Sequence, residues 1–225
     1  TLDSGSGTTR SNYIFLGWSK SQTGTTVSSP FIPTAATTLY ARWAGGTYSV
    51  AFNSNGGSAS PVNMSYTTGG ASLALPSAGS KTGFTFDGWS ETLNGTVISG
   101  AYTTTADITL YAKWSAVSYS ITYNRGTIAG TAVPATGQLT TFPTNSTSTF
   151  STLVNLDSTI DTSTVISGTT YVFTGWKESG TNAVYKGGDA YRMPAADVTF
   201  TAQWVAVYTV SYILNGGTGA VPADV

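Results

Sequence analysis

The chain has 225 residues, a formal net charge of −1 and only 8% charged residues. So little charge excludes the basic surface with which proteins bind nucleic acid or an anionic membrane. Cysteine and histidine are absent, which removes the thiolate and imidazole metal ligands and the usual general base of serine and cysteine hydrolases. We therefore expect no metal, no cofactor and no enzymatic activity, and no apolar run approaches the roughly 20 residues of a membrane span.

All six tryptophans fall in two motifs that alternate along the chain, Gly-Trp and a terminal Ala-x-Trp. The two motifs lie 25, 25 and 28 residues apart in the three successive pairs. A spacing held this closely indicates modules in tandem. The predicted structural anchors of the repeat are the six tryptophans and the glycines before three of them: Gly17, Trp18, Trp43, Gly88, Trp89, Trp114, Gly175, Trp176 and Trp204.

The repeat divides the chain into four predicted segments. They are the C-terminal part of a first module (1–43), a complete second module (47–114), a third module (117–204) and the N-terminal part of a fourth (207–225). The third module contains an expansion, which we place in its Thr/Ser-rich stretch between residues 137 and 170. Because β-branched residues and glycine dominate and helical periodicity is absent, we expect mainly β modules with at most one short helical turn each.

The strands can be predicted from alternation of apolar with small or polar residues. An opening strand followed by a turn recurs at 48–52, 119–123 and 208–212. The Gly-Trp strand follows later in each module. The closing strand ends the module, and its alternation places Trp114 on the core face together with Leu110.

The Gly-Trp strand contains a break in phase. In the second module, strict alternation would place Trp89 on the face opposite Phe84 and Phe86. An extra residue at Asp87-Gly88 would restore the phase, because a β-bulge reverses the facing and glycine accepts the required backbone angles. The alternative is that the tryptophan faces the neighbouring module. The same pattern recurs in all three Gly-Trp strands, which favours the bulge.

Together these motifs resemble a known repeat. The second module reads Tyr48-x-Val50-x-Phe52-Asn53-x-Asn55-Gly56-Gly57, then Lys81-Thr82-Gly83-Phe84-x-Phe86-x-Gly88-Trp89, then Ile108-Thr109-Leu110-Tyr111-Ala112-Lys113-Trp114. This series resembles the Listeria–Bacteroides repeat, also called the internalin B-type repeat, over nearly the whole chain. The resemblance implies a small β-grasp-like module found in tandem on bacterial surface proteins, where it acts as a stalk or adhesion segment, and it implies no catalytic residue.

Two chemical sites can be weighed against simpler interpretations. Asp157 and Asp161 carry oxygens suited to Ca²⁺, but their spacing fails the EF-hand pattern, which favours a solvated loop. Lys113 or Lys177 could form an isopeptide crosslink with an Asn beside Glu91 or Glu178, as some bacterial surface domains do. That chemistry needs all three groups buried, and Lys113 falls on the predicted polar face.

The tyrosines offer a third possibility. Tyr102 and Tyr111 are expected to be at least partly exposed, and exposed aromatic rings can form a platform on which sugars stack. Packing at the edge of the core is the simpler interpretation of both.

The terminal segments allow two functional hypotheses. If the chain is an excerpt of a longer array, it is a non-enzymatic stalk or spacer. If instead the last half-module completes the first half-module of another copy, strand addition builds a head-to-tail filament. The inter-subunit strand would then comprise Tyr208, Val210, Tyr212 and Leu214. An adhesin that binds a surface glycan or a receptor is the alternative function. All of these hypotheses expect an extracellular location on a bacterial surface or cell wall.

Overall fold

The computed structural model describes residues 2–128, 130–133 and 139–220, and they divide into two compact units, residues 1–115 and 116–225. The described part of each unit contains strands and no helix. The prediction of mainly β repeats with at most one short helical turn per module is therefore confirmed for the described residues. The β-grasp part of the resemblance stays a prediction.

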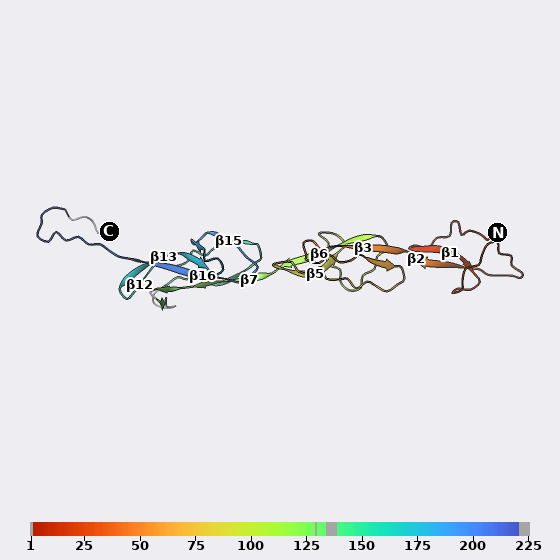
Figure 1. Ribbon diagram of the computed structural model, residues 1–225, viewed down its shortest axis with the longest axis horizontal. Coiled ribbons are helices and arrows are strands. Elements are labelled where there is room, and N and C mark those ends of the chain that lie inside the picture. Colours follow the sequence, from red (N-terminus) through yellow and green to blue (C-terminus); the bar gives the residue numbers. More distant parts are fainter. Residues whose placement is uncertain (1, 129, 134–138, 221–225) are drawn as a thin grey trace. The chain divides into compact units, whose positions relative to one another are not determined.

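The second module forms a four-stranded mixed sheet in the first unit (Figure 1). Its opening strand β3 lies beside its closing strand β6 and runs parallel to it, with Val50 opposite Ile108. Strand β4 pairs antiparallel with the other edge of β3. The sheet order is β4-β3-β6-β5, and the strands are β3 (Thr47–Asn53), β4 (Met64–Thr67), β5 (Phe84–Ser90) and β6 (Ile108–Ala116).

The residues before β3 form only a two-stranded sheet. Strands β1 (Tyr13–Ser19) and β2 (Tyr40–Gly45) pair antiparallel and correspond to the Gly-Trp and closing strands of a module. Ser19 also bridges Thr26 beyond β1. No opening strand lies against β2 among the described residues, so this part has the strands predicted for the second half of a module.

The second unit repeats the sheet of the second module with additions (Figure 1). Its path is β10-β7-β16-β13-β12, in which β7 and β16 are again parallel. These strands are β7 (Ser118–Asn124), β10 (Ser146–Thr149), β12 (Ser163–Ile166), β13 (Thr169–Glu178) and β16 (Val198–Val207). Short ladders add β8 (Thr127–Ile128), β9 (Thr131–Ala132), β11 (Leu153–Asn155), β14 (Val184–Tyr185) and β15 (Ala190–Arg192).

The expansion of the third module is divided between two places. Tyr48 pairs with Tyr66 in the second module, whereas the equivalent Tyr119 pairs with Ser148, so most of the extra residues lie between opening strand and partner. The β8–β9 hairpin occupies this region, and residues 134–138 of it lie outside the described part. The remainder forms β12. The β8–β9 hairpin thus lies before the stretch near residues 137–170 in which we placed the expansion, β12 lies within it, and the extent of the expanded loop stays a prediction.

Each complete module encloses its own core. In the first unit the buried cluster contains Val50, Trp89 and Leu110, and in the second unit it contains Ile121, Trp176 and Phe200. A buried tryptophan removes roughly 150–250 Å² from water, worth about 4–6 kcal/mol at roughly 25 cal/mol per Å². The tryptophans are therefore the largest single contributors to these small cores.

Candidate functional site

The feature that repeats most closely is an aromatic trio in which one phenylalanine lies between two tryptophans. Phe86 contacts Trp89 and Trp114 at ring-centroid distances of 5.6 and 5.3 Å. The same trio forms in the other two modules: Phe15 with Trp18 and Trp43 at 5.5 and 5.3 Å, and Phe173 with Trp176 and Trp204 at 5.0 and 5.7 Å. The two tryptophan motifs of each module therefore meet across the Gly-Trp and closing strands.

A β-bulge brings the tryptophan to the same face as this phenylalanine. In the first module the register shifts between Phe15 and Gly17, and in the third it shifts between Phe173 and Gly175. The bulge prediction is confirmed in both. Gly17, Gly88 and Gly175 have φ values of 129°, 132° and 149°, which L side chains rarely adopt.

Hydrogen bonds from the indole groups tie each tryptophan to a loop. The Gly-Trp indole donates to an upstream carbonyl in every module, such as Trp89 Nε1 to Pro76 O at 2.6 Å. The closing tryptophan donates to the turn after the opening strand: Trp114 to Ser54 O at 3.1 Å and Trp204 to Arg125 O at 2.8 Å. In the described part of the chain, Trp43 Nε1 has no such acceptor, because no opening strand lies beside it.

The segment predicted as an inter-subunit strand follows β16 directly. Residues 208–214 belong to no strand of the described chain. Tyr208, Val210 and Tyr212 are 75%, 52% and 44% exposed. Their role in pairing with another copy stays a prediction.

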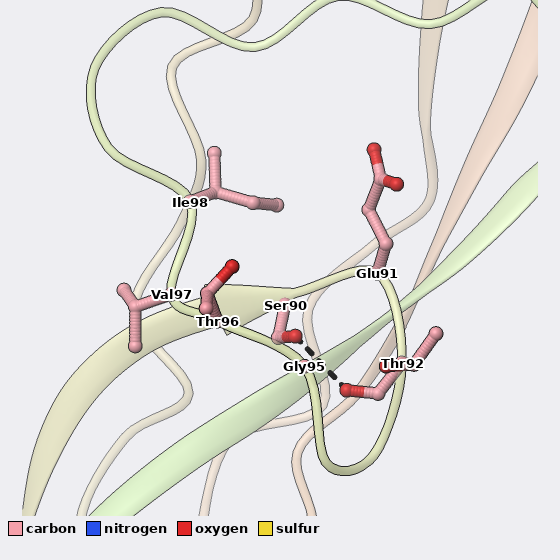
Figure 2. Close-up of a pocket in the computed structure, with 7 residues that line it drawn as sticks. All are labelled: Ser90, Glu91, Thr92, Gly95, Thr96, Val97 and Ile98. Carbon is pink, nitrogen blue, oxygen red and sulfur yellow. Dashed lines mark hydrogen bonds between the residues drawn. The ribbon is translucent and has the colours of Figure 1, made fainter.

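The loop after the second Gly-Trp motif encloses a small pocket of about 240 Å³ (Figure 2). Ser90 is buried and its hydroxyl donates to the carbonyl of Thr92 at 2.9 Å. Glu91 is the one carboxylate in the lining, and its side chain points away from the Ser90 hydroxyl in Figure 2. A hydroxyl already committed to a carbonyl and without a neighbouring base is not an activated nucleophile. The pocket is therefore better described as a folded turn.

A second pocket, of about 280 Å³, lies beside the closing tryptophan of the second module. Lys81 and Lys113 both line it together with Trp114. Lys81 Nζ donates to Asn55 O at 3.0 Å and lies 4.7 Å from the Phe84 ring centroid. Lys113 Nζ donates to Leu93 O at 3.1 Å. The pocket thus combines two ammonium groups with aromatic rings and has no carboxylate in its lining.

The predicted tyrosine platform is wrong at one of its two positions. Tyr102 is 5% exposed and forms an isolated backbone β-bridge with Leu73. Its hydroxyl donates a hydrogen bond to Glu91 Oε1 at 3.2 Å. Burial, followed by the charge of Glu91, raises its pKa above the ordinary value. Tyr111 is half-buried in β6. The simpler interpretation of Tyr102 as packing was right, because the loop that bears it folds back on the sheet.

The aspartates weighed as Ca²⁺ ligands hold loops together. Asp161 accepts hydrogen bonds from Thr140 and Thr141, and those from the Thr141 hydroxyl and the Thr140 amide lower its pKa. Asp157 accepts from the amide of Thr159 at 2.7 Å. Within the described residues, no group of three or more acidic side chains is arranged to hold a metal.

Lys177 and Glu178, the lysine and glutamate considered for a crosslink in the third module, differ in burial. Lys177 is exposed, whereas Glu178 is 3% exposed and accepts hydrogen bonds from the amides of Gly180 and Thr181 at 2.8 and 2.6 Å. Burial opposes ionisation of Glu178, but hydrogen bonds from the Thr181 hydroxyl and from the amides of Thr181 and Gly180 outweigh it and hold its pKa below the ordinary value. Glu178 therefore closes a tight turn, and Lys177 does not meet the burial that a crosslink requires.

This geometry defines an all-β protein of tandem modules with a recurring aromatic core. A model of the Listeria–Bacteroides repeat domain matches residues 1–42, 48–113 and 139–203, so the chain belongs to that family. The predicted resemblance is confirmed.

Individual proteins are also similar. Two proteins of Evansella cellulosilytica, named as a membrane protein and a Gly-rich membrane protein, are 28% and 31% identical over 88% and 83% of this chain. The chain spans only 28% and 19% of their lengths. Among solved structures, two SHIRT domains of a streptococcal cell surface protein cover 71% of the chain and 98% of their own at 15% identity and a TM-score of 0.28. No helix suited to crossing a membrane occurs in the portion described.

Proposed function

We propose that this chain is a non-enzymatic, load-bearing segment, a stalk or spacer of a bacterial surface protein. The observation that carries the proposal is the parallel pairing of the first and last strands of each complete module. Strands β7 and β16 lie side by side with Ile121 opposite Val198 and Tyr123 opposite Phe200. The family assignment and the relatives named as membrane proteins support an extracellular position on the surface or cell wall.

Parallel terminal strands resist tension for a geometric reason. The module is entered at the start of β7 and left at the end of β16, and in a parallel pair these points lie at opposite ends. Tension along the chain therefore loads the hydrogen bonds between the strands in shear, and several must break together. In an antiparallel pair pulled from one end, the bonds break one at a time.

The connection between the first two modules in the first unit is also held firmly. Between β2 and β3 the amide of Gly46 donates to Asn12 O at 2.8 Å, and its carbonyl accepts from Thr68 N at 2.9 Å. A Cβ on the neighbouring Gly45 would lie 2.1 Å from Thr68 O. Because both backbone groups of the connecting residue are bonded, this junction is not a free hinge, which suits a spacer.

Force spectroscopy on the full chain tests the load-bearing role. The chain has no cysteine, so introduced cysteines define the points of attachment without interference. Ser118→Cys with Val207→Cys pulls β7 and β16 in shear. Thr170→Cys with Val207→Cys is the matched control, because Thr170 lies opposite Val207 in the antiparallel pair of β13 and β16 and the bonds are peeled. We expect the first geometry to unfold at a force several times higher, and equal forces would remove the mechanical argument.

Head-to-tail assembly is a second candidate, favoured by the open edge of β2. Segment 208–214 has the pattern of the opening strands that pair with the closing strands elsewhere in this chain. Bound beside β2 of a second copy, it would bring a turn carbonyl to Trp43, as Ser54 and Arg125 do for their tryptophans. This pairing would complete the first module.

Light scattering across a concentration series tests this assembly. We expect linear oligomers of the full chain that disappear in Val210→Pro, because proline removes a ladder hydrogen bond. Thr218→Pro, outside the strand pattern, is the control and should assemble normally. A wild-type monomer at all concentrations, or unchanged assembly of Val210→Pro, would exclude strand addition by this segment.

A further inference from the structure

The pocket beside Trp114 has a composition that its structural role does not require. Lys81 donates a hydrogen bond to the carbonyl of Asn55 and Lys113 donates one to the carbonyl of Leu93, whereas an ammonium group has three donors. Neither lysine forms an ion pair with the described residues. Two half-buried ammonium groups therefore line one small pocket, and each has hydrogen-bond donors that are not used in the part of the chain that the structure describes. This local positive charge occurs in a chain whose net charge is −1.

The same pair of positions is basic in the first module. Arg10 forms an isolated backbone β-bridge with Tyr13, as Lys81 does with Phe84. The Arg10 guanidinium also lies 3.8 Å from the centroid of the Tyr13 ring. Arg42 precedes Trp43 as Lys113 precedes Trp114, and it donates to the carbonyl of Gln22, four residues after the Gly-Trp motif, as Lys113 donates to Leu93. Four of the nine basic residues thus occupy two equivalent positions.

The third module lacks both charges. Gly168 and Gln203 occupy the positions of Lys81 and Lys113, counted from their tryptophans. The fold of a module therefore forms without the basic pair, since the aromatic trio and the core of the second unit are intact. A pair that the fold does not need, and that repeats in two modules, is better explained by a ligand.

We propose that the pocket of the second module binds an acidic saccharide. The negative group, a carboxylate or a phosphate, accepts hydrogen bonds from Lys81 and Lys113, because charge-assisted hydrogen bonds are the strongest that a small open site can offer. The apolar face of the sugar ring packs against the exposed part of Trp114, since an aromatic ring supplies apolar area to an otherwise polar site. Asn55 and Asn94, both exposed in the lining, provide amide groups for the sugar hydroxyls.

The volume agrees with this ligand class. About 280 Å³ is at the lower end of the range of roughly 300–1,000 Å³ for small-molecule sites, so the pocket accommodates one sugar unit of a longer polymer. Weak binding per site is expected, and repetition of the basic pair in the first module would add avidity toward a polymer. The proposal goes beyond the spacer function, because a spacer needs no ligand.

Nuclear magnetic resonance of the full chain tests the site. The probes are a galacturonic acid trisaccharide and galactose 6-phosphate, which distinguish carboxylate from phosphate recognition, with a neutral galactose trisaccharide as control. We expect an acidic probe at millimolar concentration to shift the indole signal of Trp114, while that of Trp204, beside the neutral Gln203, stays in place. Raising the salt concentration should weaken the shift, because exposed charges are screened.

Two matched double variants distinguish binding at this pocket from a general effect of the protein's net charge. Lys81→Gln with Lys113→Gln should reduce the affinity measured at Trp114 at least tenfold. Lys177→Gln with Lys186→Gln changes the net charge equally at exposed residues of the third module and should leave the affinity unchanged. Unfolding curves verify that both variants fold. The proposal is overturned if both pairs weaken binding equally, if the neutral sugar binds as well, or if no acidic probe shifts Trp114.

Discussion

The bulge glycine of the third module is expected to be a sensitive backbone position. Gly175 has a φ of 149°, and a Cβ built on it would lie 2.6 Å from the carbonyl oxygen of Tyr185 and 2.8 Å from Val184 Cγ1. In Gly175→Ala the unfavourable backbone conformation costs about 1–3 kcal/mol. Displacing the β14 backbone adds a comparable cost of about 1–3 kcal/mol, so we expect a total loss of about 2–6 kcal/mol.

Two other glycines serve as graded controls. Gly168 also has a positive φ, 81°, but a Cβ there would meet nothing within 4 Å. Gly168→Ala therefore carries only the conformational cost of about 1–2 kcal/mol. Gly88 is intermediate, because its Cβ would lie 2.7 Å from the side-chain atom Val97 Cγ1, which can move more easily than a backbone carbonyl.

Scanning calorimetry of the full chain measures this series. The expected order of destabilisation is Gly175→Ala, then Gly88→Ala, then Gly168→Ala, with the first and last acting on the transition of the second unit. Equal losses for Gly175→Ala and Gly168→Ala would refute the reasoning, because they would show that the close contact with Tyr185 contributes nothing and that positive φ alone sets the cost.

Three further outcomes follow from single side chains. Trp114→Phe should cost about 1 kcal/mol more than Trp43→Phe in chemical unfolding, because only the indole of Trp114 has a hydrogen-bond acceptor, and equal costs would contradict this. Glu178→Gln should cost about 1.5–3 kcal/mol at neutral pH. Because the pKa of Glu178 is lowered by folding, its contribution is present above the unfolded pKa of about 4.3 and is lost as pH falls through the folded pKa, so wild type and variant should converge in acid. Burial, then the charges of Glu178 and Tyr185, raise the pKa of Tyr191 to about 12, so Tyr191→Phe should remove a phenol that ionises near this pH in ultraviolet titration.

The sequence allowed the strand plan and the bulge to be predicted because both follow from periodicity. Alternation in β3 and β6 marks which residues face the core, and the break in phase before Trp89 requires an extra residue wherever the tryptophan is to stay inside. These are properties of neighbouring residues, so a single chain contains enough information.

The burial of Tyr102 and the indole acceptors could not be predicted because they depend on contacts between distant loops. Tyr102 is buried by its bridge to Leu73, 29 positions earlier, and Trp114 finds its acceptor 60 positions earlier at Ser54. The basic pocket had a signal that could have been used. Alignment of the modules on their tryptophans places Lys81 and Lys113 at positions that are basic again in the first module.

The first module shows what the opening strand contributes, because the same hairpin occurs there without it. Trp18 is only half-buried, whereas its equivalents Trp89 and Trp176, whose rings contact Phe52 and Tyr123 of the opening strands, are 2% and 0% exposed. The opening strand therefore completes the core through contacts between residues far apart in sequence, such as Val50 with Ile108. Removing it from the sheet would expose the buried tryptophan, so rupture of the parallel pair and loss of the core must occur together. A module that can yield only in this all-or-none way holds its length until the parallel pair fails, which is the property that a load-bearing spacer requires.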